Sequence, residues 1–336
     1  MNAVLSDTPA LSETEVAVTL SAYPTTPDRQ LNTTSRQTLG TQPARAMCAA
    51  DQLSASPNGR YLLIQYNCEA ALFAILQDLQ TGKETTLARG YFLDWSPDGD
   101  WLLFRQTDED AIWLVQAATG SRQTLPNLPA GVYNAAFHFD GQTVVLAASQ
   151  GLGLGSELGV YHHLATTSYT RWQTFPQQVV AYPRWSPDGT KLAYILMPDS
   201  NQPFTVGELW LAEPGTGAPT QLLDAVDAGH GYPPVWSPNG QSLAYVRREN
   251  PDSVRADHLA AALRSNLMLA NAAAGQTTPL TSFPDSLVYD AIWSPDGAQL
   301  AFTADDAIWL VSPGQSSTQI TQSMTARHPA WLVENN

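Results

Sequence analysis

The stretch Trp185-Ser186-Pro187-Asp188-Gly189 decides the fold of this chain. Proline presets the backbone for the first position of a tight turn, aspartate suits the second, and glycine accepts the left-handed conformation that restarts a β-ladder. Residues 182–184 on one side and 192–195 on the other have the composition of strands. The stretch is therefore predicted to join two antiparallel strands through a tight turn.

The chain repeats this turn along most of its length. After each copy come further short apolar stretches that are separated by turn residues. Four antiparallel strands in a repeat of about 40–45 residues are typical of a propeller blade, so we expect an all-β propeller. The residues that directly precede the turn are, in chain order, Ala55, Trp95, Phe137, Trp185, Trp236, Trp293 and, in a degenerate last copy, Trp331.

The motif Trp-Ser-Pro-Asp/Asn-Gly, followed by an aliphatic-Ala-aromatic strand and an Ile-Trp-Leu-Val-type strand, resembles the TolB-like, WD40-like propeller repeat. The resemblance covers residues 45–336. The copy at Ala55 lacks the tryptophan, and the copy at Phe137 has His138 and Phe139 in place of Ser-Pro. The resemblance implies a β-propeller fold and a role in envelope or periplasmic protein assembly, whereas propellers as a class host many unrelated activities.

The two ends of the chain are predicted to meet in one blade. Six complete blades are expected between residues 50 and 323, and the tail 327–332 has the pattern of the innermost strand of one more. The outer strands of that blade can come from the N-terminus, where 16–20 alternates, and this removes the free edge at the seam. We therefore expect seven blades in a single domain, 16–336, after a flexible arm, 1–15. Six blades with a loose N-terminal arm is the alternative.

The composition fits a large β-rich core under an acidic surface. Hydrophobic residues make up 43% of the 336 residues, charged residues 14%, and the formal net charge is -15. Such a surface repels nucleic acid and anionic membranes, so neither is an expected partner. No apolar run is long enough to span a membrane, and residues 1–15 lack the features of a signal peptide. This start fits a cytoplasmic protein or one that begins after a removed export segment, while the resemblance implies a periplasmic or extracytoplasmic location.

Residues just before each first strand are the candidates for a binding site. In a propeller the first strand of each blade lines the channel, so the residues before it lie at one mouth. Tyrosine recurs there, which suggests an aromatic collar for a peptide or a sugar ring. The competing interpretation is that each tyrosine packs against the neighbouring blade. Counting back three or four residues from each tryptophan position selects Asp51, Tyr91, Tyr133, Tyr182, Tyr232, Tyr289, Asp290, Arg327 and His328.

Motifs for catalysis are missing from the sequence. The glycine-rich 151–155 lacks the Lys-Ser/Thr of a phosphate loop, no Gly-x-Ser-x-Gly nucleophile elbow occurs, and no histidines have metal-ligand spacing. We therefore expect a non-enzymatic propeller, without cofactor or metal, that binds a protein or peptide partner at the channel mouth. The alternative is a lyase or hydrolase acting on an acidic or polymeric carbohydrate, in which His230, His328 and Asp290 converge. A scaffold with no selective mouth is a third interpretation.

The longest loop at this mouth, 249–265, carries a helix signal. Asp252 or Ser253 can cap a helix that continues through an Ala/Leu-rich run to Arg264. A short helix there would be either a lid on the mouth or an inert insertion.

The two cysteines are placed so that they can pair. If Ser56 lies opposite Arg60 across the first turn, the same register places Cys48 opposite Cys68, with Cα atoms about 5.5 Å apart. A disulfide between them would favour an oxidising compartment. Two free buried thiols are the alternative, and a bulge between the turn and the cysteines would break the register.

Overall fold

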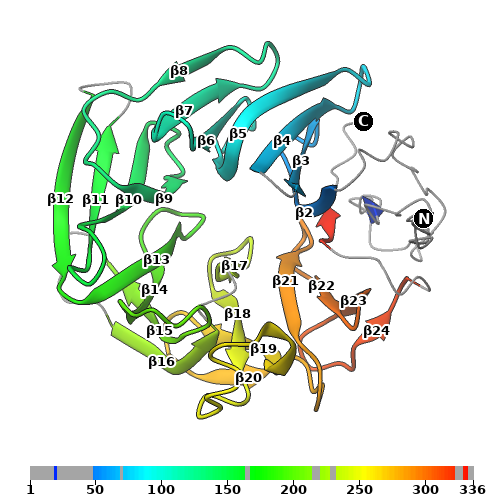
Figure 1. The fold of residues 1–336 in the computed structure, drawn as a ribbon. Coiled ribbons are helices and arrows are strands. Elements are labelled where there is room, and N and C mark those ends of the chain that lie inside the picture. Colours follow the sequence, from blue (N-terminus) through cyan, green and yellow to red (C-terminus); the bar gives the residue numbers. More distant parts are fainter. Residues whose placement is uncertain are drawn as a thin grey trace, which may run out of the picture.

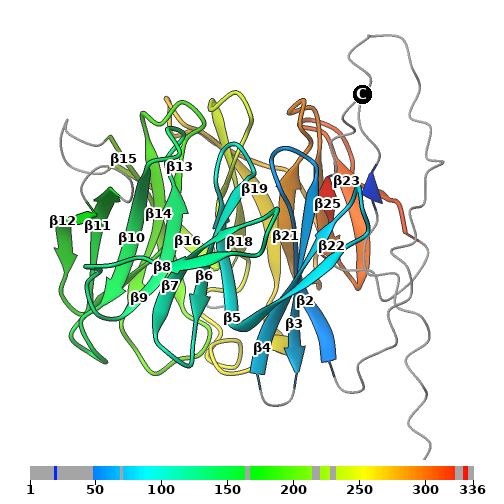
Figure 2. The same ribbon diagram turned by 90° about the horizontal axis from the view of Figure 1, so that it is seen from above.

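Short antiparallel strands arranged in a ring form the fold of this chain, as the computed structural model shows (Figure 1). Seen from the side, the strands stand roughly along the axis of the ring (Figure 2). The described part of the chain comprises residues 19–20, 48–68, 71–162, 167–213, 220–227, 232–321 and 328–331. Within these ranges, no helix has the length and apolar character needed to cross a membrane.

The described strands form six groups of four, each running from the inside of the ring outward. The first three groups are β2 (Cys48–Ala55), β3 (Tyr61–Cys68), β4 (Ala71–Asp78) and the start of β5 (Glu84–Trp95); the end of β5, β6 (Trp101–Gln106), β7 (Ala111–Gln116) and β8 (Arg122–Thr124); and β9 (Val132–Phe137), β10 (Thr143–Ser149), β11 (Ser156–His162) and β12 (Ser168–Phe175). The fourth group is β13 (Gln178–Trp185), β14 (Leu192–Pro198), β15 (Val206–Ala212) and β16 (Thr220–Asp227). In the fifth group the end of β16 and β17 (Val235–Trp236) together form the inner strand, followed by β18 (Ser242–Arg248), β19 (Ser265–Asn271) and β20 (Thr277–Pro279). The sixth group is β21 (Val288–Trp293), β22 (Leu300–Ala304), β23 (Ala307–Val311) and β24 (Thr318–Gln319).

This arrangement confirms the predicted all-β propeller of four-stranded antiparallel blades. The core lies between adjacent blades, because the middle strands of each blade are buried on both faces. For example, Leu63 and Leu76 of the first blade pack with Leu102 and Phe104 of the second, and all four side chains are fully buried. Sheets that stack radially in this way need the consecutive apolar residues that the second strands carry.

The seam of the ring differs from the predicted shared blade. β25 (Ala330–Trp331) pairs with β1 (Thr19–Leu20), but the two strands run parallel, whereas the strands of a blade run antiparallel. Ala330 also packs in the core cluster of the first blade with Leu53, so β25 contacts both neighbours. The other residues of the predicted shared blade, and the arm 1–15, lie outside the described residues. Seven blades therefore stay a prediction.

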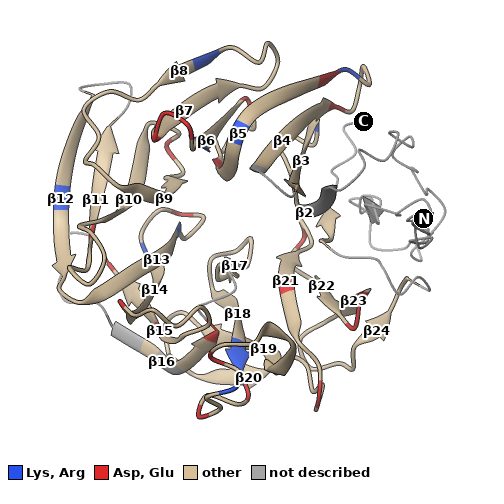
Figure 3. Ribbon diagram, viewed as in Figure 1, with Lys and Arg blue, Asp and Glu red and all other residues tan. Residues whose placement is uncertain are grey.

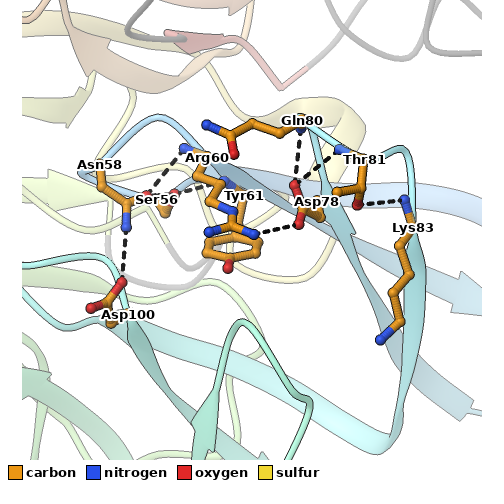
Figure 4. A network of polar contacts seen from close by, with 9 residues as sticks. All are labelled: Ser56, Asn58, Arg60, Tyr61, Asp78, Gln80, Thr81, Lys83 and Asp100. Atoms are coloured by element: carbon orange, nitrogen blue, oxygen red, sulfur yellow. Dashed lines mark hydrogen bonds and ion pairs between the residues drawn. The ribbon is translucent and has the colours of Figure 1, made fainter. Parts of the chain in front are cut away.

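The repeated turn is held by its own side chains. In the first blade Ser56 Oγ accepts the N–H of Tyr61 at 2.9 Å and donates to Asn58 Oδ1 at 2.7 Å (Figure 4). Asn58 Nδ2 in turn donates to Asp100 Oδ1, in the turn of the next blade, at 3.2 Å. In the fourth blade the Ser186 hydroxyl donates to Asp188 and holds the pKa of that carboxyl below its ordinary value. The Ser-Pro-Asp/Asn-Gly residues therefore serve the fold.

In several repeats the tryptophan before the turn fastens one blade to the preceding one. Nε1 of Trp236 donates to the carbonyl of Arg184 at 3.0 Å, and Nε1 of Trp293 donates to the carbonyl of Val235 at 3.2 Å. Nε1 of Trp331 repeats the contact, with the carbonyl of Ile292 at 3.2 Å. β25 therefore occupies the position of an inner strand next to the sixth blade.

Trp185 offers a matched control for this contact, because no acceptor among the described residues lies within hydrogen-bond distance of its buried Nε1. We expect Trp236→Phe to lower the free energy of unfolding by about 1 kcal/mol more than Trp185→Phe, since only the first removes a hydrogen bond and leaves a carbonyl unpaired. Urea unfolding of the two variants measures the difference. Equal losses would mean that the tryptophans contribute only their packing.

The helix predicted after Ser253 is wrong. The loop 249–264 is a series of turns with a single 3₁₀ turn, η1 (Ala260–Ala262). Arg248 is buried beneath the loop and donates to the carbonyls of Asn250 and Ser253 and to the Asp257 carboxylate, so the loop folds around the guanidinium. The Ser253 carbonyl also accepts the N–H groups of Ala256 and Asp257, which closes one turn that does not continue into a helix.

Candidate functional site: the loop mouth

One end of the ring carries the loops that join the second and third strands of each blade, and we call this end the mouth. The starts of the first strands lie at the same end, because the outer strand of each blade leads directly into the inner strand of the next. The described loops of the mouth are 107–110, 150–155, 199–205, 249–264 and 305–306.

Two of the predicted collar tyrosines bridge neighbouring blades. The hydroxyl of Tyr91 donates to the carbonyl of Tyr133 at 3.3 Å, and the hydroxyl of Tyr133 donates to the carbonyl of Val180. Burial raises the pKa of both phenols above the ordinary value. At these two positions the structure supports the packing interpretation, because each hydroxyl is already used to join blades.

Tyr182 lies on a bulge of the fourth inner strand. Its backbone is left-handed, with a φ of 52°, and its N–H donates to Asn134 Oδ1 of the third blade at 2.9 Å. Burial raises the pKa of Tyr182 to about 12. The ring borders a pocket of about 190 Å³ whose other walls include Met197 and Asp199. Tyr182 therefore faces a shallow pocket of the mouth, while its backbone belongs to the joint between blades.

The same bulge position brings Asp290 and His328 together. Both residues are left-handed, with φ values of 55° and 58°, and each lies three residues before the tryptophan of its blade. Bulges re-aim side chains, and here Asp290 Oδ2 lies 2.7 Å from His328 Nδ1 across the joint. The backbone N–H of His328 also donates to the hydroxyl of Thr303 at 3.2 Å. The Asp290 side chain is 33% exposed and that of His328 16%.

Two aromatic rings extend this pair. The Tyr289 ring stacks on Tyr232 with centroids 5.1 Å apart and an interplanar angle of 25°. It also meets the His328 ring edge to face at 6.3 Å. Tyr232, Tyr289, Asp290 and His328 form what we call the Tyr–His–Asp cluster. The structure thus brings four of the predicted mouth residues into contact on the fifth and sixth blades and the seam.

The position of Tyr232 has a different origin from that of the other tyrosines. In the inner strand of the fifth blade, Val226 and Val235 both pair with β18, and residues 227–234 lie between them. At the equivalent place in the fourth blade, only residues 181–183 intervene. Tyr232 therefore lies on an insertion, and β17 stands closest to the centre of the ring in Figure 1. Counting back from the tryptophan selects this residue although the strand is interrupted before it.

Three predicted residues fall outside what the structure describes. Arg327, the alternative ligand His230 and the side chain of Asp51 lie in this category. Among the described residues, no group of three or more His, Cys, Asp and Glu side chains is arranged to hold a metal ion.

The sequence interpretation missed Arg248, which organises the mouth loops. Its side chain is fully buried and donates to Asp257 Oδ1 at 2.7 Å and to the carbonyl of Phe204 at 3.1 Å, in addition to two carbonyls of its own loop. The N–H of Gly155 donates to Asp199 Oδ2 at 3.1 Å. Loops 150–155, 199–205 and 249–264 are therefore tied into one continuous structure, which we call the rim. An arginine at a strand end gives no sequence signal for this role.

The rim carries large apolar side chains in solvent. Leu152 is 82% exposed, Leu154 64%, Val254 70% and Leu259 44%. They lie on the two outer loops of the rim, from the third and fifth blades. Exposed apolar groups that are surrounded by polar residues mark interaction sites on many proteins.

The charges around the inner strands and the mouth are mainly acidic (Figure 3). Acidic residues occupy 108–110 and 305–306 in two of the mouth loops. On the inner strand of the second blade, burial raises the pKa of the Asp94 carboxyl, although the positive charge of Arg184 acts in the opposite direction. The mouth therefore attracts cations and repels anions.

Comparisons with known proteins establish the fold. No protein-family model matches the chain. A sequence relative, the uncharacterized peptidase YuxL of Bacillus subtilis (strain 168), is 27% identical over 129 residues, which cover 37% of this chain and 17% of that protein. TolB from Acinetobacter baumannii has 18% identity and a TM-score of 0.50, covering 85% of this chain and 66% of that one. Oligogalacturonate lyase from Vibrio parahaemolyticus has 14% identity and a TM-score of 0.53, covering 77% and 76%. The chain thus has a TolB-like β-propeller fold.

Proposed function

We propose that this chain is a non-enzymatic propeller that binds a protein or peptide partner at the mouth. The observation that carries the proposal is the rim, where Leu152, Leu154, Val254 and Leu259 are held in solvent on loops that are hydrogen-bonded to one another. Full burial of one such side chain contributes about 1.5–3 kcal/mol, so a partner that covers several of them gains substantial affinity.

The rim is also suited to binding because it is organised in advance. Arg248 and Asp199 fix the loops through contacts that do not involve the exposed side chains. A partner therefore does not have to order these loops when it binds, and less of the contact energy is lost to entropy.

Selection from a peptide display library, followed by calorimetry on the selected peptides, tests this proposal. We expect Leu152→Ser combined with Val254→Ser to weaken binding by at least about tenfold, since two buried contacts are lost. Phe139→Ser is the matched control, because Phe139 is 54% exposed but lies on a turn at the opposite end of the ring. A selection that yields no peptide, or an equal loss in the control, would contradict the proposal.

Two further features belong to the same proposal. The ring has seven blades, of which the last contains β25 together with N-terminal residues; the inner-strand position of β25 beside the sixth blade supports this, although its pairing with β1 is parallel. The protein works outside the cytoplasm. Support for that location comes from the disulfide at Cys68 and from the TolB-like fold, because disulfides persist in oxidising compartments.

A carbohydrate lyase or hydrolase is a second candidate, which the hydrogen bond between Asp290 and His328 supports. A carboxylate that orients an imidazole is a common arrangement for a general base. The acidic charge of the mouth, however, disfavours the binding of an anionic sugar. Turnover of polygalacturonate by the wild-type chain that is lost in His328→Ala would favour this candidate over binding.

A further inference from the structure

We propose that the Tyr–His–Asp cluster binds a cationic side chain of the partner, an arginine or a lysine. The inference rests on the proposed function and assigns a chemical class to one part of the bound partner. It concerns the inner part of the mouth, which is distinct from the apolar rim.

The first element of this site is a carboxylate held in place. Asp290 Oδ2 accepts a hydrogen bond from His328 Nδ1, while a third of the side chain remains open to solvent. The hydrogen bond from His328 Nδ1 fixes the orientation of the carboxylate. The cluster therefore presents an oriented carboxylate that is partly open to a second donor.

The second element is the aromatic surface beside this carboxylate. Consecutive residues of a regular strand point to opposite faces, but the bulge at Asp290 interrupts that alternation. Tyr289 and Asp290 consequently contact the same residue, His328, one through its ring and the other through its carboxylate. The Tyr232 ring stacks on Tyr289 and enlarges the aromatic surface. Ring faces next to a carboxylate are the groups that bind guanidinium and ammonium ions.

The third element is the electrostatic field. The formal net charge of the chain is -15, and residues 305–306 add two carboxylates on the loop of the same blade. A cation gains from Asp290 and from this field, whereas an uncharged group of the same shape gains from neither. Arginine suits the site best, because its planar guanidinium can stack on a tyrosine while it donates to a carboxylate.

Two short peptides test the inference. The probes are acetyl-Leu-Arg-Leu-Arg-amide and the same peptide with citrulline in place of arginine, which keeps the shape and removes the charge. We expect the arginine peptide to bind the wild-type chain about tenfold or more tightly than the citrulline peptide, because citrulline keeps N–H donors but lacks the positive charge that pairs with the carboxylate. In Asp290→Asn the difference should fall below about threefold. Isothermal calorimetry at two salt concentrations measures all four affinities.

Matched variants separate this site from general attraction. Asp305→Asn removes one charge from the field around the mouth but leaves the Asp290 carboxylate in place, so it should reduce the arginine preference much less than Asp290→Asn does. Tyr289→Phe keeps the ring face and should retain binding, whereas Tyr289→Leu should weaken the arginine peptide selectively, with folding verified by circular dichroism. Equal binding of both peptides, unchanged by Asp290→Asn, overturns the cation site and leaves the binding function standing. Failure of both peptides to bind overturns the cation site, and an empty library selection in addition overturns the binding function as well.

Discussion

Replacing Arg248 with methionine is expected to lower the free energy of unfolding by about 3 kcal/mol. The guanidinium is fully buried and donates to the Asp257 carboxylate and to three carbonyls, those of Phe204, Asn250 and Ser253. Methionine fills much of the volume but leaves these acceptors unpaired. Breaking one side of a buried ion pair is costly for this reason, and Asp257 is only 16% exposed.

Arg247 provides the matched control for this change. It is the preceding residue on the same strand, but its side chain is 36% exposed and pairs with Glu249 at the surface. Arg247→Met should therefore change the free energy of unfolding by no more than about 1 kcal/mol. Urea unfolding and limited proteolysis give separate readouts, and we expect new cleavage within 249–264 in Arg248→Met alone. Equal stability of the two variants would show that the rim does not depend on the buried guanidinium.

The dependence on Arg248 also explains what the sequence could not predict about the mouth. An Asp-Ser pair before an Ala/Leu-rich run is a helix signal, but the turn after Ser253 does not continue into a helix, and the loop there folds around the buried guanidinium of Arg248. This arrangement depends on a side chain from β18 and on the neighbouring blade, where Phe204 lies. Tertiary contacts of this kind leave no periodicity in the sequence, so the rim had to be found in the structure.

The blades, in contrast, could be predicted, since their signals are local. Ser56 bonds to Asn58 and to the N–H of Tyr61 within one turn, and the same spacing of residues recurs in most blades. The mouth was predicted in part. Counting back from each tryptophan finds Asp290 and His328, because both lie at the same bulge. It cannot tell Tyr91, whose hydroxyl joins two blades, from Tyr289, whose ring belongs to the cluster.

The register of the cysteines was predicted from an incorrect pairing. Ser56 pairs with Tyr61 across the turn, one residue further than expected, and a bulge next to Gln52 then shifts the register back by one. The two differences cancel, so Cys48 does lie opposite Cys68. Cys68 is disulfide-bonded, and no described cysteine is a free thiol. A bulge alone would break the predicted register, but here it aligns the two cysteines.

Reduction of this disulfide is expected to lower the free energy of unfolding by about 3 kcal/mol, the value for a closed loop of about 15–20 residues. Cys68 lies on β3 opposite residue 48 of β2, in the blade that packs against Ala330, where the ring closes. Loosening this hairpin therefore weakens the seam as well as one blade. Urea unfolding with and without dithiothreitol measures the effect.

The double variant Cys48→Ser with Cys68→Ser separates the bond from other effects of the reductant. It should be less stable than the oxidised wild type by the same amount, and dithiothreitol should not change it further. Thiol alkylation of the native wild-type protein should label neither cysteine until it is reduced. Labelling of both cysteines in the untreated native protein would contradict the prediction, and it would also remove the disulfide as support for a location outside the cytoplasm, since free thiols are the rule in reducing compartments.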